Sequence, residues 1–175
     1  MPPVTPQVTV LMAVRDGKNH IGEANQSILR QSFRNFELIV VDAGSRDGTG
    51  RMLADYNDPR IRVITSRKRL YPSSARNLGL CQARGRYVAI MDSDDKSHPD
   101  RLARQVRHLR RAPRIGAVGA YARVMDRDGN TLRALHFPTE PGCVAWSLLF
   151  GGWAVCHPAT LIRRSLFRRL NGYRE

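Results

Sequence analysis

The sequence predicts an α/β fold with a mostly parallel sheet that is covered by helices on both faces, in a single domain. Short β-branched apolar runs alternate with longer stretches of helical spacing over most of the 175 residues. These runs are continuously apolar, which is typical of parallel strands buried on both faces. A chain of this length matches one domain with one substantial core.

The strand predictions follow the apolar runs in chain order. VTVLMAV at residues 8–14 is the first, and FELIVV at residues 36–41 is the second. The remaining predicted strands cover residues 61–64, 86–91 and 115–125. DRDGN at residues 126–130 predicts a turn after the last of them.

The helix predictions rest on apolar residues spaced three and four apart. Residues 19–32 show this spacing, a short helix follows GSRDGT, and Pro72 opens a helix that runs to about Cys81. Pro99 opens the last one, an amphipathic helix with Leu102 on its apolar face. Its predicted exposed face carries Arg101, Arg104, Arg107, Arg110 and Arg111.

Several classes of protein are excluded. No apolar run approaches the ~18 residues of a membrane-spanning helix, and the first ten residues lack the order of a secretion signal. Cys81, Cys143 and Cys156 are widely spaced without a CxxC pair. We expect them to be small core residues of a reduced compartment rather than disulfide or zinc ligands. A cytoplasmic protein is the prediction.

Positive charge is concentrated in the second half of the chain. The whole sequence has 29 Lys and Arg against 15 Asp and Glu, a net charge of +14. Residues 96–175 account for +10 of this excess. Two interpretations stay open: an anionic partner, or a compositional bias towards arginine on solvated faces. Nucleic acid is the less favoured partner, because no aromatic residues alternate with the arginines and no nucleic-acid-binding motif is present.

Three carboxylates crowd the end of one predicted strand, in IMDSDDKSHP. Asp92 and Asp94 would project to the same side of an extended chain, with Asp95 beside them. Like charges this close repel, so we expect a cation among them. Mg²⁺ or Mn²⁺ fits, because such ions combine one or two protein carboxylates with substrate phosphates. Helix capping is the alternative, and it explains one acid but not three.

Two further segments carry polar residues after a strand or at a helix start. Asp42 precedes Gly44 and Ser45, where its carboxylate could accept hydrogen bonds from a base or a ribose, or belong to an ordinary turn. Arg76 follows Pro72 at the start of a helix, a place that attracts phosphate. Taken alone, neither segment decides between these roles.

Taken together, these segments resemble the family 2 glycosyltransferases. The matching stretches are MAVRD at 12–16, IVVDAGSRDGT at 39–49, ARNLG at 75–79 and ARGRYVAIMDSDD at 83–95. Residues 157–175 are similar to the later segment of that family, which leads to a GGY-like turn. The resemblance implies the GT-A fold of nucleotide-diphospho-sugar transferases, and inverting sugar transfer from a nucleotide-diphosphate sugar to an acceptor hydroxyl.

The resemblance also implies site residues. Ala13, Val14 and Arg15 would line the nucleotide pocket, and Asp42 would bind the base or ribose. Arg76 would face the diphosphate, and Ser93 would contact the donor. Asp92, Asp94 and Asp95 would form the DXD-type cluster that holds Mg²⁺ or Mn²⁺. Ala13 and Ala43 depart from the family, which usually has Pro and an acid or amide there.

The catalytic base that the family places in an ED-type motif, after the GGY-like turn, is expected beyond Glu175. We therefore expect a truncated chain, a split gene product or an incomplete domain. His157 is a weak candidate for the base within the chain, whereas Asp126 and Asp128 are better interpreted as turn residues. The competing hypothesis is a module that binds a nucleotide sugar without transferring it.

The predicted partners are the donor and a saccharide or lipid-linked acceptor. The basic side of the helix over 101–111 suggests contact with an anionic membrane at its inner face. The apolar segment WSLLFGGWAV at 146–155 is predicted to be core or a sealed edge. An acceptor-side wall and a homodimer contact are its alternatives.

Overall fold

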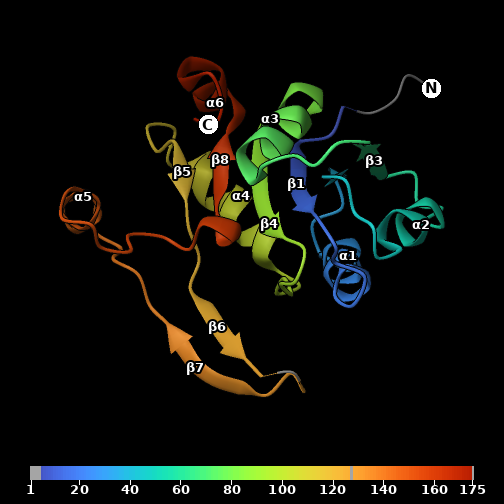
Figure 1. Cartoon of the computed structure of the whole chain (residues 1–175). Helices are drawn as coiled ribbons and strands as arrows, with labels where there is room; N and C mark the ends of the chain where they lie inside the picture. Colours follow the sequence, from blue (N-terminus) through green and yellow to red (C-terminus); the bar gives the residue numbers. More distant parts are fainter. Residues whose placement is uncertain (1–4, 127, 175) are drawn as a thin grey trace.

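A computed structural model describes residues 5–126 and 128–174 of the chain (Figure 1). Arg127, in the predicted turn, and Glu175 lie outside the described residues. The centre of the molecule is a six-stranded sheet with the strand order β3-β2-β1-β4-β8-β5. Its strands are β1 (Val8–Val14), β2 (Phe36–Asp42), β3 (Ile61–Thr65), β4 (Tyr87–Asp92), β8 (Leu161–Arg163) and β5 (Ala117–Val118).

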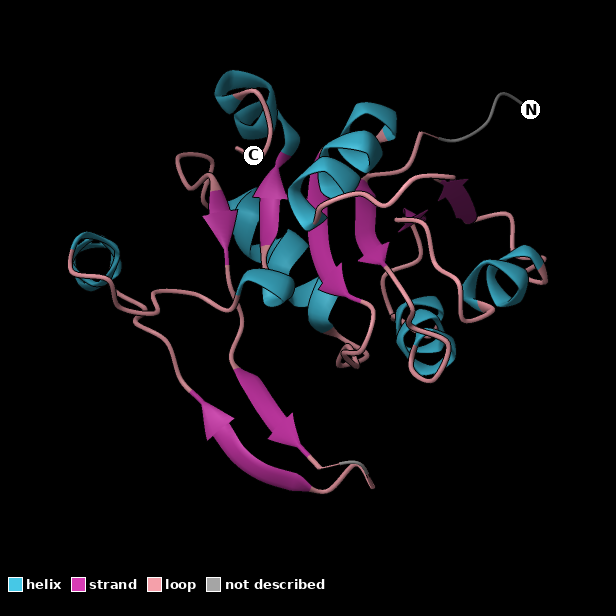
Figure 2. Cartoon of the chain, viewed as in Figure 1, coloured by secondary structure: helices cyan, strands magenta, loops and turns pink. Residues whose placement is uncertain are grey.

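The first four strands are parallel, whereas β8 is antiparallel to both β4 and β5. Helices α1 and α4 pack on one face of the sheet, and α3 and α6 pack on the other (Figures 1 and 2). The helices are α1 (Ile21–Leu29), α2 (Thr49–Ala54), α3 (Pro72–Gln82), α4 (Arg101–Arg111) and α6 (Arg164–Leu170). The predicted mostly parallel α/β fold is thus confirmed.

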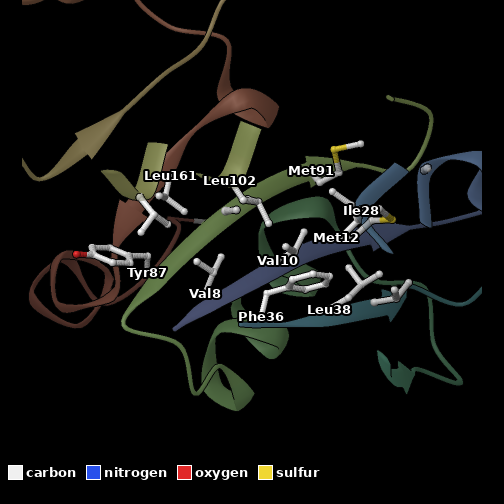
Figure 3. Packing of buried hydrophobic residues seen from close by; sticks show 14 of the residues in the cluster. Val8, Val10, Met12, Ile28, Phe36, Leu38, Tyr87, Met91, Leu102 and Leu161 are labelled. Carbon is white, nitrogen blue, oxygen red and sulfur yellow. The ribbon is translucent and has the colours of Figure 1, made fainter. Parts of the chain in front are cut away.

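Alternate residues of β1 face opposite cores. Val8, Val10 and Met12 pack with α1 and α4, as Figure 3 shows for Ile28 and Leu102. Leu11 faces the other side, against α3. A Cβ atom at Gly79 would overlap the Leu11 side chain, so glycine lets α3 lie close to the sheet. This two-sided burial explains why the strand runs are continuously apolar.

Residues between β5 and β8 leave the sheet and form an arm. It consists of the hairpin β6 (Ala122–Met125) and β7 (Thr131–Leu135), followed by α5 (Pro141–Leu149) (Figure 1). The single strand predicted over 115–125 is therefore wrong. The chain leaves β5 after Val118 and starts a new pair, in which β6 bonds only to β7. The short 3-10 helix η1 (His157–Ala159) returns the chain to the sheet.

The predicted burial of the segment 146–155 is wrong. Trp146 is 65% exposed and Trp153 is 81% exposed, because the arm carries α5 away from the sheet (Figure 2). The prediction that the cysteines are core residues is also wrong. Cys81 in α3 and Cys143 in α5 are exposed, and Cys156 is half-buried. No helix in the described part of the chain is long and apolar enough to span a membrane.

Candidate functional site

The parallel register brings three strand ends to one edge of the sheet. Ala13 of β1 pairs with Val41 of β2 on one side and with Asp92 of β4 on the other. Val14 pairs with Asp42. The predicted site residues after these strands therefore meet at the carboxyl edge, where α/β sheets bind ligands.

The loops that follow β1 and β2 are joined by side-chain hydrogen bonds. The Asp16 amide donates to the Ser45 hydroxyl (2.9 Å), and the Arg46 amide donates to the Asp16 carboxylate (2.8 Å). The Gly17 amide donates to the Thr49 hydroxyl at 3.0 Å. These bonds fix the two loops against each other and give the site a defined rim. Asp16 has a φ of 52°, a left-handed value that asparagine and aspartate tolerate best.

Asp42 is buried under this rim, with 2% of its surface exposed. Its carboxylate accepts a hydrogen bond from the Ser45 amide at 2.9 Å, so the turn role is confirmed. A Cβ atom on Gly50 would lie 3.0 Å from the other carboxylate oxygen, so glycine there lets the start of α2 lie close to Asp42. Contact of Asp42 with a base or ribose stays a prediction.

Gly44 permits the turn to contact the loop after β3. Its φ is +86°, and a Cβ atom would lie 2.8 Å from the Lys68 carbonyl oxygen. The Leu70 amide donates to the Ala43 carbonyl (3.2 Å) in the same contact. The loop leading into α3 is thereby held beside the ends of β1 and β2.

Ala13, Val14, Arg15 and Ser93 all lie at this edge. Val14 is buried, whereas Ala13 is half-buried and Arg15 is exposed. The Arg15 guanidinium lies 3.6 Å from the Asp16 carboxylate. The Ser93 hydroxyl lies 3.6 Å from where a Cβ atom of Gly17 would be, so the loops after β1 and β4 approach closely. The structure thus brings together the predicted lining residues.

Arg76 and Asp92 form an ion pair across the site. The guanidinium of Arg76, from the second turn of α3, donates to the Asp92 carboxylate at 3.0 Å. Both side chains are partly buried, with exposed fractions of 20% and 37%. Arg76, predicted on weak local grounds, therefore lies against the acidic cluster. A guanidinium in this place can also bind a phosphate group in two-pronged fashion.

Asp94 and Asp95 have no ion-pair partner among the residues that the structure describes. Burial of its carboxyl group, with repulsion from Asp92 and Asp94, raises the pKa of Asp95 to about 6, although the residue as a whole remains exposed. Within the described ranges, no group of three or more His, Cys, Asp or Glu side chains is arranged to hold a metal ion. One or two carboxylates suffice for Mg²⁺ or Mn²⁺ when phosphates complete the shell.

Arg101 is buried near Asp95, a position that the sequence analysis missed. We predicted it on the exposed face of its helix, but only 8% of its surface is exposed. Its guanidinium donates to the carbonyl oxygens of Ile90 (2.7 Å) and Pro158 (3.0 Å). Burial lowers the pKa of Arg101 to about 10, against the opposing effect of Asp95. Its place directly before Leu102, on the apolar face of the predicted helix, was the available signal in the sequence.

The last described residues of the chain also contribute to the site. Asn77 of α3 donates to the Tyr173 carbonyl (2.9 Å) and accepts from the Tyr173 amide (2.8 Å). The Tyr173 hydroxyl lies 2.9 Å from Nε2 of His157, and its ring lies 5.9 Å from the Arg76 guanidinium carbon. Burial and the nearby Arg76 charge lower the pKa of His157. His157 therefore lies close to the acidic cluster, and Tyr173 is a residue that sequence reasoning missed.

Comparisons with known proteins agree on the fold. The mannosyltransferase PcManGT from Pyrobaculum calidifontis, solved with GDP-Man and Mn²⁺, superposes with a TM-score of 0.73 at 25% identity over 99% of this chain and 49% of its own. TarS of S. aureus, solved with UDP-GlcNAc, superposes with a TM-score of 0.70 at 20% identity over 94% of this chain and 47% of its own. These similarities confirm the GT-A architecture predicted from the sequence.

Sequence relatives point the same way. EpsE of Bacillus subtilis is 36% identical over 175 residues, covering 97% of this chain and 61% of EpsE. The succinoglycan biosynthesis protein ExoO of Rhizobium meliloti is 39% identical over 130 residues, covering 73% of this chain and 36% of ExoO. The chain thus spans less than two thirds of the length of these relatives. The family model described as glycosyl transferase family 2 matches residues 9–170, and the chain belongs to that family.

Proposed function

We propose that the chain binds a nucleotide-diphosphate sugar at the carboxyl edge of the sheet and transfers the sugar, with inversion, to an acceptor hydroxyl. One observation carries the proposal: the carboxylates of Asp92, Asp94 and Asp95 lie close together at the end of β4, where Arg76 pairs with Asp92. The complex of PcManGT with GDP-Man and Mn²⁺ supports this assignment for a related protein.

The residues present fit a divalent cation. Arg76 already compensates Asp92, whereas burial, together with the negative charges of Asp92 and Asp94, raises the pKa of Asp95. A cation held by Asp94 and Asp95 would offset this repulsion between the carboxylates. Bound Mg²⁺ or Mn²⁺ would supply positive charge to the leaving diphosphate, a large contribution in such reactions.

The chain's own residues would then orient the donor and stabilise charge. Asp42 would accept hydrogen bonds from the base or ribose. Arg76 would turn part of its guanidinium towards the diphosphate and stabilise the negative charge that grows there. Ala13, Val14, Arg15 and Ser93 would line the nucleotide. The base that accepts the proton of the acceptor stays a prediction beyond Glu175, with His157 as the candidate within the chain.

The acceptor in this proposal is a saccharide or a lipid-linked saccharide. The name of ExoO refers to the biosynthesis of a polysaccharide, which supports a saccharide acceptor. A cytoplasmic site of action, at the inner face of the membrane where the acceptor is lipid-linked, belongs to the same proposal.

Calorimetry with GDP-mannose and UDP-GlcNAc, each with and without Mn²⁺, tests the donor site, and a product assay tests transfer. We expect Asp94→Asn to abolish Mn²⁺-dependent donor binding, and to lower any turnover by about 10²–10³-fold. Asp55→Asn, an exposed aspartate at the end of α2, is the matched control and should bind like the parent. Metal-dependent donor binding that survives in the Asp94 variant would refute the metal role. Donor binding without product would favour the module that only binds.

A further inference from the structure

The opposite edge of the sheet holds a basic cavity of about 570 Å³. It lies where β4 begins, β8 ends and α6 starts, next to the segment that leads into β1. Five arginines line it, and we call it the arginine cavity: Arg84, Arg86, Arg163, Arg164 and Arg168. Among its described lining residues none is acidic.

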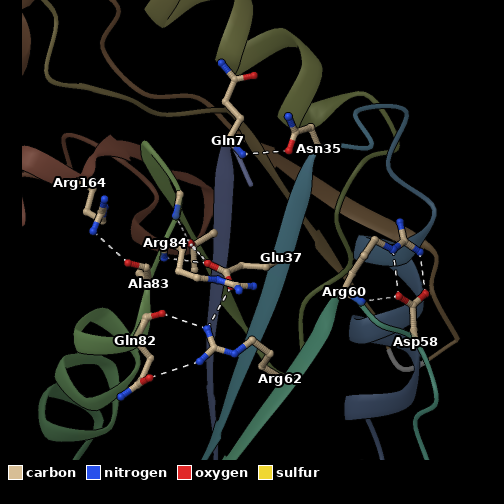
Figure 4. Close-up of polar contacts among 12 residues, drawn as sticks. Gln7, Asn35, Glu37, Asp58, Arg60, Arg62, Gln82, Ala83, Arg84 and Arg164 are labelled. Carbon is tan, nitrogen blue, oxygen red and sulfur yellow. Dashed lines mark hydrogen bonds and ion pairs between the residues drawn. The ribbon is translucent and has the colours of Figure 1, made fainter. Parts of the chain in front are cut away.

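Several of these arginines are held in place by the fold. The guanidinium groups of Arg86 and Arg163 each lie 5.6 Å from the centre of the Tyr87 ring. Arg163 also donates to the Leu109 carbonyl (2.7 Å), and Arg164 donates to the Ala83 carbonyl (3.0 Å; Figure 4). A site whose charged groups are already positioned loses less entropy when it binds a ligand.

The positive charge of the cavity is poorly compensated. Glu37 is the carboxylate that pairs with Arg84, but it is 2% exposed and also pairs with Arg62 (Figure 4). Arg86 and Arg168 have no ion pair in the part of the chain that the structure describes. Burial and the Arg168 charge both lower the pKa of Arg164, as expected where cations crowd together.

We propose that the arginine cavity binds a phosphate-bearing anion. Guanidinium groups match the oxygens of phosphate in two-pronged hydrogen bonds. Several such groups around one cavity suit a ligand with more than one negative charge. The shared chemistry is phosphate, either free in solution or on a lipid headgroup, and the experiment below separates these sources.

This site is distinct from the donor site. β4 starts at the arginine cavity and ends at Asp92, so six residues of extended strand separate the two. At ~3.3 Å per residue this is roughly 20 Å. A phosphate bound in the cavity is therefore not the donor diphosphate, and the proposal does not depend on the activity proposed above.

Calorimetry with inorganic diphosphate in metal-free buffer is the first test. We expect Arg86→Gln with Arg168→Gln to weaken binding at least about tenfold, since two charge-assisted contacts are removed. Both residues are exposed, so the double variant should fold. The matched control is Arg51→Gln with Arg107→Gln, which removes two exposed arginines that do not line the cavity. Arg76→Gln removes the phosphate-binding arginine of the donor site, and in that background the double variant of the cavity should cause the same loss of diphosphate binding.

Sedimentation with vesicles of phosphatidylcholine, with or without phosphatidylglycerol, is the second test. Binding of anionic vesicles that the cavity variant loses and the control keeps would support a lipid headgroup as the source. Diphosphate binding with the same pattern would support a soluble phosphate compound. If the cavity variant matches the control with both probes, or if Arg76→Gln alone abolishes diphosphate binding, the proposal is overturned.

Discussion

Apolar residues are buried in the central sheet and exposed in the arm formed by β6, β7 and α5. Leu38 in β2 is fully buried, whereas Leu149 in α5 is 79% exposed. Both segments are strongly apolar in sequence. The difference is that β2 lies between two strands and two helical layers, while no element of the described residues covers α5 in this way (Figure 2).

This contrast shows that apolar composition indicates that burial of a segment is favourable but does not say against which segment it packs. In the sheet, each strand is buried by the neighbouring strands and by helices on both faces. The arm leaves its apolar side chains uncovered in the described chain, and large exposed apolar patches mark contact surfaces. The same composition therefore indicates core in one region and a surface for contact in the other.

The largest expected difference between the two regions is in free energy of unfolding. Leu38→Ala should lower it by about 2–5 kcal/mol, because a fully buried side chain is removed from a packed core. Leu149→Ala, the same change in the arm, should stay within about 0.5 kcal/mol. Urea unfolding followed by circular dichroism measures both. Equal losses would mean that α5 is packed against something in solution.

A smaller effect on the free energy of unfolding is expected from Glu37, the second residue of β2. Burial raises the pKa of Glu37, but hydrogen bonds from Arg84, Thr9 and Arg62 outweigh this and hold the pKa below its ordinary value of 4.5. Glu37→Gln should cost about 1–3 kcal/mol at neutral pH, since Arg62 and Arg84 lose their charged partner.

The sign of the pH dependence follows from that lowered pKa. The stability that Glu37 contributes is fully present above its ordinary pKa of 4.5 and is lost as the pH falls through its lower value in the folded protein. Unfolding curves at neutral and acidic pH should therefore show a larger acid loss for the parent than for Glu37→Gln. An identical acid loss in both proteins would contradict the assignment.

The smallest expected effect is the change in tryptophan fluorescence on unfolding. Trp146 and Trp153 are the chain's two tryptophans, and both lie exposed in or beside α5. Their emission in the folded protein should already resemble that of the unfolded chain, while circular dichroism still reports a full transition. A homodimer through α5 would instead give blue-shifted emission that reverts on dilution. Blue-shifted emission at every concentration would contradict the exposed arm.

Much of the fold could be predicted because its signals are local. The runs that became β1, β2, β3 and β4 are continuous and apolar, and the helix starts at Pro72 and near Pro99 are marked by proline. The strand over 115–125 could not be divided from sequence. Whether β6 continues β5 or pairs with β7 depends on hydrogen bonds to Thr131–Leu135, farther along the chain.

The position of part of the candidate site could also be predicted. Aspartates and glycines at strand ends have recognisable patterns, so Asp42, Asp92, Asp94 and Asp95 were expected at one edge of the sheet, and their roles there stay predictions. Arg101 and Tyr173 were not, because their roles depend on distant partners: the Pro158 carbonyl for Arg101, and Asn77 and His157 for Tyr173.

The amino-acid sequence alone determined the strand runs from β1 to β4, the helices between them and the acidic cluster at the end of β4, because each depends on residues close together in the chain. Only the tertiary structure decided which charges meet. It paired Arg76 with Asp92, buried Arg101 and gathered five arginines at the far edge of the sheet. The physical reason is that electrostatic and packing energies depend on distance in space and on burial, and the order of residues along the chain specifies neither directly.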